Sequence, residues 1–269
     1  GGLVSVDTAA EFPVRLVESG PAGGAIFAAD VARRFGLEKV VSYDMGGTTA
    51  KICLIEDFAP KTARSFEVAR TTRFAKGSGM PISIPVIEMI EIGAGGGSIA
   101  WVDAMGRIQT GPESAASEPG PACYQRGGER PAITDADLVL GKLDPDNFAG
   151  GAIRLSTENA QAAIARDVGD RLSLTAEAAA FGICEVVDEN MANAARVHAV
   201  ENGKNISENL MVAFGGAAPL HAARLCEKLG IDQCLIPSGA GVGSAIGFLK
   251  APFGYEALTS QVVRLADFD

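Results

Sequence analysis

The segment VVSYDMGGTTAKICLIE, residues 40–56, constrains the fold of this chain more than any other stretch. Two short apolar runs rich in β-branched residues flank the turn DMGGTT, a pattern that predicts two antiparallel strands joined by a tight turn. Gly46 and Gly47 can reach positive φ and bring backbone N–H groups close to an anion, while Asp44 can hold a hydrated Mg²⁺. Thr48 and Thr49 add hydroxyl groups. The turn is therefore one half of a candidate nucleotide site, and a plain glycine hairpin is the alternative.

Composition narrows the ways in which the chain can hold phosphate. Its 269 residues are 47% hydrophobic and 21% charged, which predicts a globular protein with one large core or two modest ones. With 23 basic and 33 acidic residues the net charge is −10, which argues against a general nucleic-acid surface. Backbone amides, helix ends and Mg²⁺ are then the expected means of binding phosphate.

Cysteine usage and hydropathy predict a cytoplasmic protein without a membrane segment. The five cysteines are odd in number, widely spaced and never in a CxxC pair, as in reduced cytosolic proteins. No signal peptide opens the chain, and no apolar run reaches the roughly 18 residues that cross a bilayer. Because the chain starts with Gly1 and its first clear element is already in mid-fold, we expect a fragment of a longer polypeptide.

A helix is predicted from Pro21 to Phe35, with Gly36 as its C-terminal stop. Its start is rich in alanine and glycine, so another backbone can lie close to it. That backbone is either a ligand-binding loop or a neighbouring helix.

Residues 87–143 form the most glycine-dense part of the chain. Alternating patterns in IEMIEI, SIAWVD and RIQT predict strands, and the long Pro- and Gly-rich loop after them is typical of a functional segment. Cys123 in that loop is interpreted as a buried thiol rather than a nucleophile. In TDADL, Thr134 is the predicted N-cap of a helix. Asp135 and Asp137 favour its dipole, with a metal-binding role as the alternative.

The last third of the chain reads as helices and a β-α-β-α unit. Helices are predicted at 157–168 and 175–201, the latter with a buried stripe that ends at His198. The strand LMVAF then leads into Gly215, Gly216 and Ala217, and a helix ending at Leu229 precedes the strand QCLIP, so a parallel pair is expected. The turn after the first strand is where α/β folds bind ligands. His221 in the following helix is interpreted as a packing residue.

Several ordered motifs resemble those of the ATP-dependent hydantoinase A, 5-oxoprolinase and ketone carboxylase β-subunit family. They are ESGPAGG, DMGGT, GAGGGSIAWVD, GPESA, PGPACY, RGG, TDADLVLG and AFGGAAPLHA, and the likeness covers nearly the whole chain. The family is a branch of the acetate and sugar kinase, heat-shock chaperone and actin superfamily. The resemblance implies an α/β fold, namely the ribonuclease-H-like second lobe of an actin/sugar-kinase-type ATPase, with a mixed sheet, flanking helices and a glycine-rich insertion.

The resemblance also implies a domain organisation. Residues 1–269 are expected to be a single hydantoinase A-type domain, with the insertion at about 71–160. The family's N-terminal lobe, with its own DxGGTFTD-like turn, is missing from this sequence. Lys51 stands where an aspartate is common in the family, and it either meets phosphate charge directly or alternates outward along the strand.

The function implied by the resemblance is a lobe of an ATP-dependent amidohydrolase that opens a hydantoin or 5-oxoproline type ring through phosphorylation. Asp44 is the expected catalytic residue and, with Asp135 and Asp137, a metal ligand for Mg²⁺; the ATP-binding residues are those of the two glycine turns, Gly46, Gly47, Thr48, Thr49, Gly215, Gly216 and Ala217. Expected partners are the missing N-terminal lobe and a hydantoinase B-type subunit or domain, with no nucleic acid and no membrane. The alternatives are a ketone carboxylase β-subunit and a chaperone-like reactivating ATPase.

Overall fold

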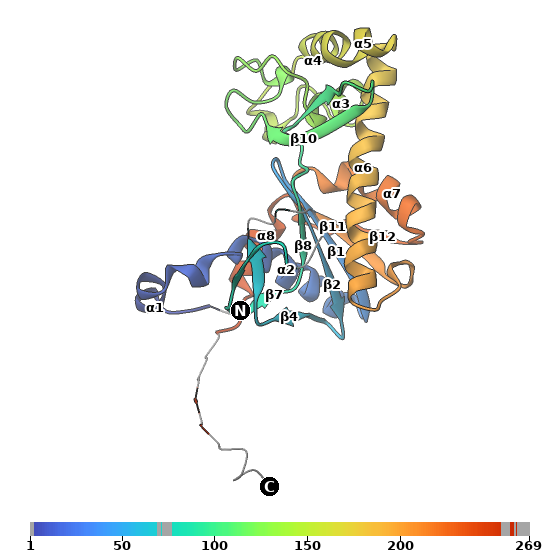
Figure 1. The fold of residues 1–269 in the computed structure, drawn as a ribbon. Coiled ribbons are helices and arrows are strands. Elements are labelled where there is room, and N and C mark those ends of the chain that lie inside the picture. The colour runs from blue at the N-terminus through green and yellow to red at the C-terminus, as the bar shows by residue number, and fades with distance from the viewer. Residues whose placement is uncertain (1–2, 69–70, 72–76, 254–258, 261, 263–269) are drawn as a thin grey trace.

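A mixed six-stranded sheet forms the centre of the computed structural model, which describes residues 3–68, 71, 77–253, 259–260 and 262 (Figure 1). The strand order is β12-β11-β1-β2-β3, and β8 also pairs with β2. The strands are β1 (Lys39–Met45), β2 (Ala50–Glu56), β3 (Ala59–Pro60), β8 (Ile90–Ile92), β11 (Leu210–Phe214) and β12 (Cys234–Leu235). The predicted hairpin of β1 and β2 and the predicted parallel pair of β11 and β12 are both confirmed.

Helices cover both faces of the sheet. α2 (Ser19–Phe35) and α8 (Gly243–Leu249) lie on one face, and α6 (Ala176–Glu201) and α7 (Ala218–Leu229) lie on the other. Side chains of β1 alternate between the two cores, because Val41 and Tyr43 pack with α6 and α7 whereas Val40 packs with α2. The same alternation places Asp44 on the α2 face.

The small residues of α2 serve two purposes. A Cβ atom on Gly247 of α8 would lie 1.8 Å from the carbonyl oxygen of Gly23, so the two helices meet at backbone distance. A Cβ atom on Gly24 would lie 2.9 Å from Oδ2 of Asp44. Helix packing therefore accounts for Gly23, and the approach to the end of β1 accounts for Gly24. The helix ends at Gly36 as predicted, with φ of 66°.

A second part of the molecule lies beyond the end of the sheet, at the top of Figure 1. It contains β9 (Ser98–Val102), β10 (Ile108–Ser114), α3 (Ile133–Val139), α4 (Thr157–Ile164) and α5 (Asp170–Leu172). The long helix α6 runs from this part down along the sheet, so it contributes to both (Figure 1). The predicted stripe of α6 is confirmed, since residues from Ile183 to His198 on that face are buried.

The predicted N-cap of α3 is wrong. Ala132 precedes the helix, and Thr134 lies in its first turn, where its hydroxyl donates a 2.8 Å hydrogen bond to the carbonyl oxygen of Gly96. Because the acceptor lies in a loop that is distant in the sequence, the local sequence pattern could not predict this hydrogen bond.

Short elements complete the described chain. They are α1 (Val6–Glu11), β4 (Thr62–Ala63), β5 (Phe66–Val68), β6 (Met80–Ile82) and β7 (Val86–Ile87). The expected mixed α/β architecture with flanking helices is confirmed, whereas the ribonuclease-H-like assignment and the domain bounds stay predictions; residues 72–76, near the expected start of the insertion, lie outside the described residues. No described helix is long and apolar enough to span a membrane.

Candidate functional site

Asp44 lies at the end of β1, half-buried between two glycine backbones. A Cβ atom added to Gly215 would lie 2.6 Å from Oδ1 of Asp44, and one added to Gly24 would lie 2.9 Å from Oδ2 of Asp44. Among the described residues, none forms a hydrogen bond or ion pair with this carboxylate. Burial raises the pKa of Asp44, and the neighbouring charge of Lys51 opposes that rise. An unpaired, partly desolvated carboxylate with open oxygen atoms fits a cation that keeps most of its water, as Mg²⁺ does.

The turn after Asp44 presents backbone N–H groups. The Gly46 amide donates to the carbonyl oxygen of Thr49 at 3.1 Å and closes the turn. Gly47 and Thr48 are exposed, and their N–H groups have no acceptor within the described part of the chain. Neither Gly46 nor Gly47 adopts positive φ, so the conformational reason first given for these glycines is wrong. A Cβ atom added to either glycine would meet open space, so the lack of side chains leaves the surface of the turn uncovered.

Lys51 faces the candidate site. It pairs with Asp44 across β1 and β2, so the two side chains project on the same face of the sheet. Its Nζ lies 2.5 Å from Oγ1 of Thr49 and 3.4 Å from Oε1 of Glu91, and its side chain is 20% exposed. The lysine is therefore held beside the carboxylate and the turn rather than directed away from them.

Glu18 is a further candidate residue that the sequence pattern did not single out. It precedes α2 in the left-handed conformation, with φ of 66°, although it is not a glycine. Burial and the charge of Glu91 raise the pKa of Glu18, while the charge of Lys51 opposes that rise. Strained backbone of this kind is concentrated at functional sites. The acid in ESGPAGG was visible in the sequence, but its backbone conformation was not.

The second glycine turn meets the first because β1 and β11 are parallel neighbours. Gly215 has φ of 96°, and a Cβ atom there would lie 2.4 Å from the carbonyl oxygen of Met45. The Ala217 amide donates to that same oxygen at 2.9 Å. Gly216 is exposed, and a Cβ atom there would meet open space. The structure thus brings together Asp44, both turns and Lys51 at one edge of the sheet.

Asp135 and Asp137 lie elsewhere, in α3. Both carboxylates have protein partners: Asp135 accepts hydrogen bonds from the amides of Cys123 and Ala132, both at 2.7 Å, and Asp137 binds Nζ of Lys142 at 2.9 Å. Within the described ranges, no cluster of three or more histidine, cysteine or acidic side chains has the arrangement of a metal site. These contacts explain the two aspartates without a metal, and their metal-binding role stays a prediction. Cys123 is buried, as expected.

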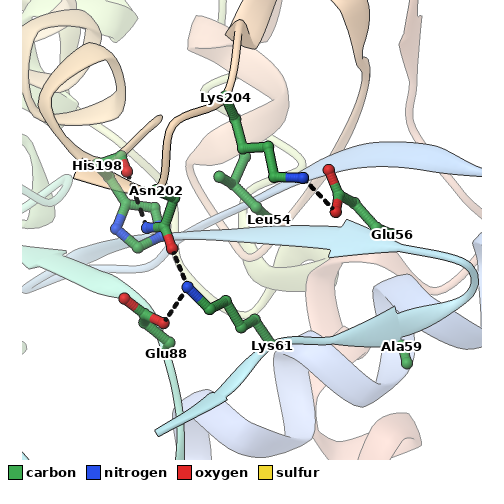
Figure 2. A pocket seen from close by; sticks show the side chains of 8 residues that line it. All are labelled: Leu54, Glu56, Ala59, Lys61, Glu88, His198, Asn202 and Lys204. Carbon is green, nitrogen blue, oxygen red and sulfur yellow. Dashed lines mark hydrogen bonds and ion pairs between the residues drawn. The ribbon is translucent and has the colours of Figure 1, made fainter. Parts of the chain in front are cut away.

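A small hollow lies at the other end of β2, near Glu56 (Figure 2). Its volume is about 90 Å³. Lys61 pairs with Glu88 at 3.1 Å, and Lys204 pairs with Glu56 at 2.8 Å, so its cations are neutralised by the protein. This hollow is separate from the two glycine turns.

Comparison with known proteins bears on what the two turns do. The sequence profile of the hydantoinase/oxoprolinase family matches residues 1–257. The chain belongs to this family. It is 37% identical to the caprolactamase subunit alpha of Pseudomonas jessenii over 267 residues, 99% of this chain and 37% of that relative. It is 33% identical to the 5-oxoprolinase of Saccharomyces cerevisiae over 263 residues, 93% of this chain and 19% of that relative.

Two solved structures show the same architecture. The hydantoinase/oxoprolinase chain matches nucleotide-free acetone carboxylase with a TM-score of 0.78 and 31% identity, over 88% of this chain and 32% of the other. It matches the ATP-dependent caprolactamase from Pseudomonas jessenii with a TM-score of 0.73 and 34% identity, over 86% and 32%. The chain therefore spans about a third of these proteins.

Proposed function

We propose that this chain is the ATP-binding lobe of an enzyme that opens a cyclic amide of the hydantoin or 5-oxoproline type through phosphorylation by ATP. The observation that carries the proposal is the unpaired carboxylate of Asp44, which lies at the start of the first glycine turn and against Gly215 of the second. Family membership and the ATP-dependent caprolactamase among the similar structures support the same reaction class.

Backbone amides supply the proposed phosphate contacts. The N–H groups of Gly47 and Thr48 in one turn, and of Gly216 in the other, lack acceptors among the described residues. Such amides bind anions and stabilise the charge that develops during phosphoryl transfer. Thr49, Ala217 and Gly215 shape the two turns, and Lys51 adds a positive charge beside them.

Asp44 would hold Mg²⁺, which when bound neutralises phosphate charge and orients the transferred group. The fit rests on the carboxylate itself, whose oxygens are open and unpaired while glycines leave room around them. Lys51 lowers the pKa of this carboxyl against the effect of burial, and so favours the ionised form that binds a cation.

Glu18 is the proposed proton acceptor. Its pKa is raised by burial and by Glu91, which brings a carboxylate closer to the range in which it exchanges protons at neutral pH. In the proposed reaction the γ-phosphoryl group moves to the amide oxygen. One water then adds to the activated carbon, and the ring C–N bond breaks as the nitrogen takes up a proton and leaves as the amine. A second water releases phosphate from the resulting acyl phosphate and leaves the carboxylate. Glu18 would take the proton from the water that adds to the activated carbon.

The remaining parts of the enzyme are also proposals. The lobe would have the ribonuclease-H-like fold of actin/sugar-kinase-type ATPases and would close on ATP with an N-terminal lobe. A hydantoinase B-type subunit or domain would complete the substrate pocket in the cytoplasm. The names of similar proteins, which include subunits alpha, beta and gamma, support assembly with other chains.

A ketone carboxylase β-subunit is the second candidate. The acetone carboxylase beta subunit of Xanthobacter autotrophicus is 32% identical over 242 residues, and acetone carboxylase is among the similar structures. The same site would then phosphorylate an enolate or bicarbonate. A chaperone-like ATPase is disfavoured by the family match, which includes the glycine-rich segment.

The test is ATP turnover by the full-length chain with its partner subunit and Mg²⁺. We expect ADP release to depend on 5-oxoproline, hydantoin or caprolactam, and the ring-opened amino acid to appear in equal amount. Glu56→Gln, at the far end of β2, is the matched control for Asp44→Asn. ADP release driven by acetone and bicarbonate instead would establish the carboxylase function, and turnover indifferent to all of these compounds would refute both.

A further inference from the structure

The turn at residues 45–47 faces the proposed phosphate site and is called the phosphate-facing turn below. Its carbonyl groups accept hydrogen bonds from two sides. Gly46 accepts a hydrogen bond from the Gly96 amide at 3.0 Å, and Gly47 accepts one from the Gly97 amide at 2.7 Å. The preceding carbonyl, that of Met45, accepts from Ala217 at the start of α7. Three successive carbonyls are therefore fixed by two segments that are far apart in the sequence.

The glycine segment is in turn bound to α3. Both the amide and the hydroxyl of Thr134 donate to the carbonyl oxygen of Gly96, each at 2.8 Å. A Cβ atom on Gly96 would lie 2.8 Å from the Thr134 hydroxyl, so only glycine permits this contact without a shift. One turn later along the same helix, Asp137 points to α7.

His221 of α7 completes a closed ring of contacts. This ring runs from the turn through Gly96, Thr134 and Asp137 to His221, and returns to the turn through Ala217. The Nε2 atom of His221 lies 3.1 Å from Oδ2 of Asp137, and its Nδ1 lies 2.8 Å from Oδ1 of Asp188 on α6. The three side chains are 0%, 1% and 2% exposed. Lys142 and the Cys184 thiol also contact Asp137, at 2.9 and 3.4 Å. A buried network with this many satisfied groups holds its elements in one arrangement.

We propose that His221 is a positioning residue for the phosphate-facing turn. Through Asp137, Thr134 and Gly96 it fixes one side of the turn, and through the start of α7 at Ala217 it fixes the other. The ring sets the separation between the free amides at Gly47 and Gly216. This inference rests on the proposed function only for the identity of the ligand, because every contact in the ring joins residues of this chain.

A purely structural role for His221 makes a different prediction. If it only stabilised the core, its loss would lower protection from hydrogen exchange throughout the sheet, whereas a positioning role loosens the turn first. The amides of Gly96, Gly97 and Ala217 are the donors of the ring and report on it directly. The amides of residues 40–43 in β1 report on the core.

The experiment is hydrogen–deuterium exchange of the nucleotide-free full-length chain. His221→Gln and Thr134→Val should each accelerate exchange at the three ring amides by about tenfold relative to the parent, with residues 40–43 unchanged. His198→Gln is the matched control, because His198 is the other histidine in the sequence and is likewise buried, but lies on α6 outside the ring. This variant should leave exchange at the three ring amides unchanged. A uniform acceleration that includes 40–43, or none at the ring, would overturn the proposal.

A rescue variant and ATP titration complete the test. In Asp137→Asn with His221→Gln, two neutral side chains can hydrogen-bond to each other, so slow exchange at the ring should largely return, and absence of any recovery would count against the ring. Titration with Mg²⁺ and ATP should show weaker binding by His221→Gln than by His198→Gln. If the parent chain binds no ATP, the proposed function fails, and the exchange measurements still decide whether His221 positions the turn.

Discussion

Asp44 and Lys51 lie directly opposite each other on the antiparallel pair β1 and β2, on the face covered by α2. Burial raises the pKa of both Asp44 and Glu18, and the positive charge of Lys51 opposes that rise at each of them. One positive charge therefore serves two partly buried carboxyl groups. Lys51 places this cation beside the turn, and the electrostatics of the site depend on it.

We expect Asp44→Asn to abolish ATP-dependent turnover in the full-length enzyme while the free energy of unfolding changes by no more than about 1 kcal/mol. The carboxylate has no partner among the described residues, and burial penalises its charged form, so its loss removes no native contact. Turnover assays and denaturant unfolding measure the two effects. Activity within a few-fold of the parent would show that the site is placed wrongly.

Lys51→Gln should move the acidic limb of the pH profile of kcat/KM to higher pH. The direction follows from the pKa shifts: Lys51 lowers the pKa of Asp44, so removing the lysine raises that pKa further, and the ionised form is lost at a higher pH as the solution is acidified. Lys51→Arg keeps the charge and should keep the limb near its original position. An identical profile for Lys51→Gln would mean that the lysine does not act on the essential carboxyl group.

The two glycines of the second turn should respond differently to alanine. Gly215→Ala places a Cβ atom 2.4 Å from the Met45 carbonyl oxygen at φ of 96°, and should destabilise the protein by about 1–3 kcal/mol. Gly216→Ala meets open space and should leave the melting temperature nearly unchanged while raising the KM for ATP. Thermal melts and ATP kinetics on both variants separate the roles. Equal losses of stability would contradict the assignment.

Acid should loosen the contact between α6 and α7. Arg224, then Lys228, lowers the pKa of Glu185 from 4.5 to about 2, through ion pairs of 2.7 and 3.0 Å. Because the folded-state pKa is below the unfolded value, the stabilisation is present above about pH 4.5 and is lost as pH falls toward 2. Glu185→Gln should flatten this part of the stability curve by about 1 kcal/mol at most, since the pairs are partly exposed. Urea unfolding at several pH values measures the difference.

Local sequence patterns predicted the elements that depend on near neighbours in the chain. The hairpin around DMGGTT, the helix that ends at Gly36 and the buried stripe of α6 all follow from periodicity and from glycine positions, and the structure confirms them. Gly215 and Asp44 were likewise singled out, and the parallel pairing of β1 with β11 brings them together. Periodicity indicates which face of an element is buried, so that face can be predicted without knowing which element packs against it.

Tertiary structure alone decided how the site is held. His221 was expected to pack in the core, and it does, but its contact with Asp137 joins residues 84 positions apart and has no local signature. The left-handed backbone of Glu18 likewise has no signature in the sequence. The hydrogen bonds from the Gly96 and Gly97 amides to the turn join segments that are distant in the sequence. A residue's neighbours along the chain determine its secondary structure and its buried face, whereas hydrogen-bond partners across the fold depend on which elements the closed core brings together.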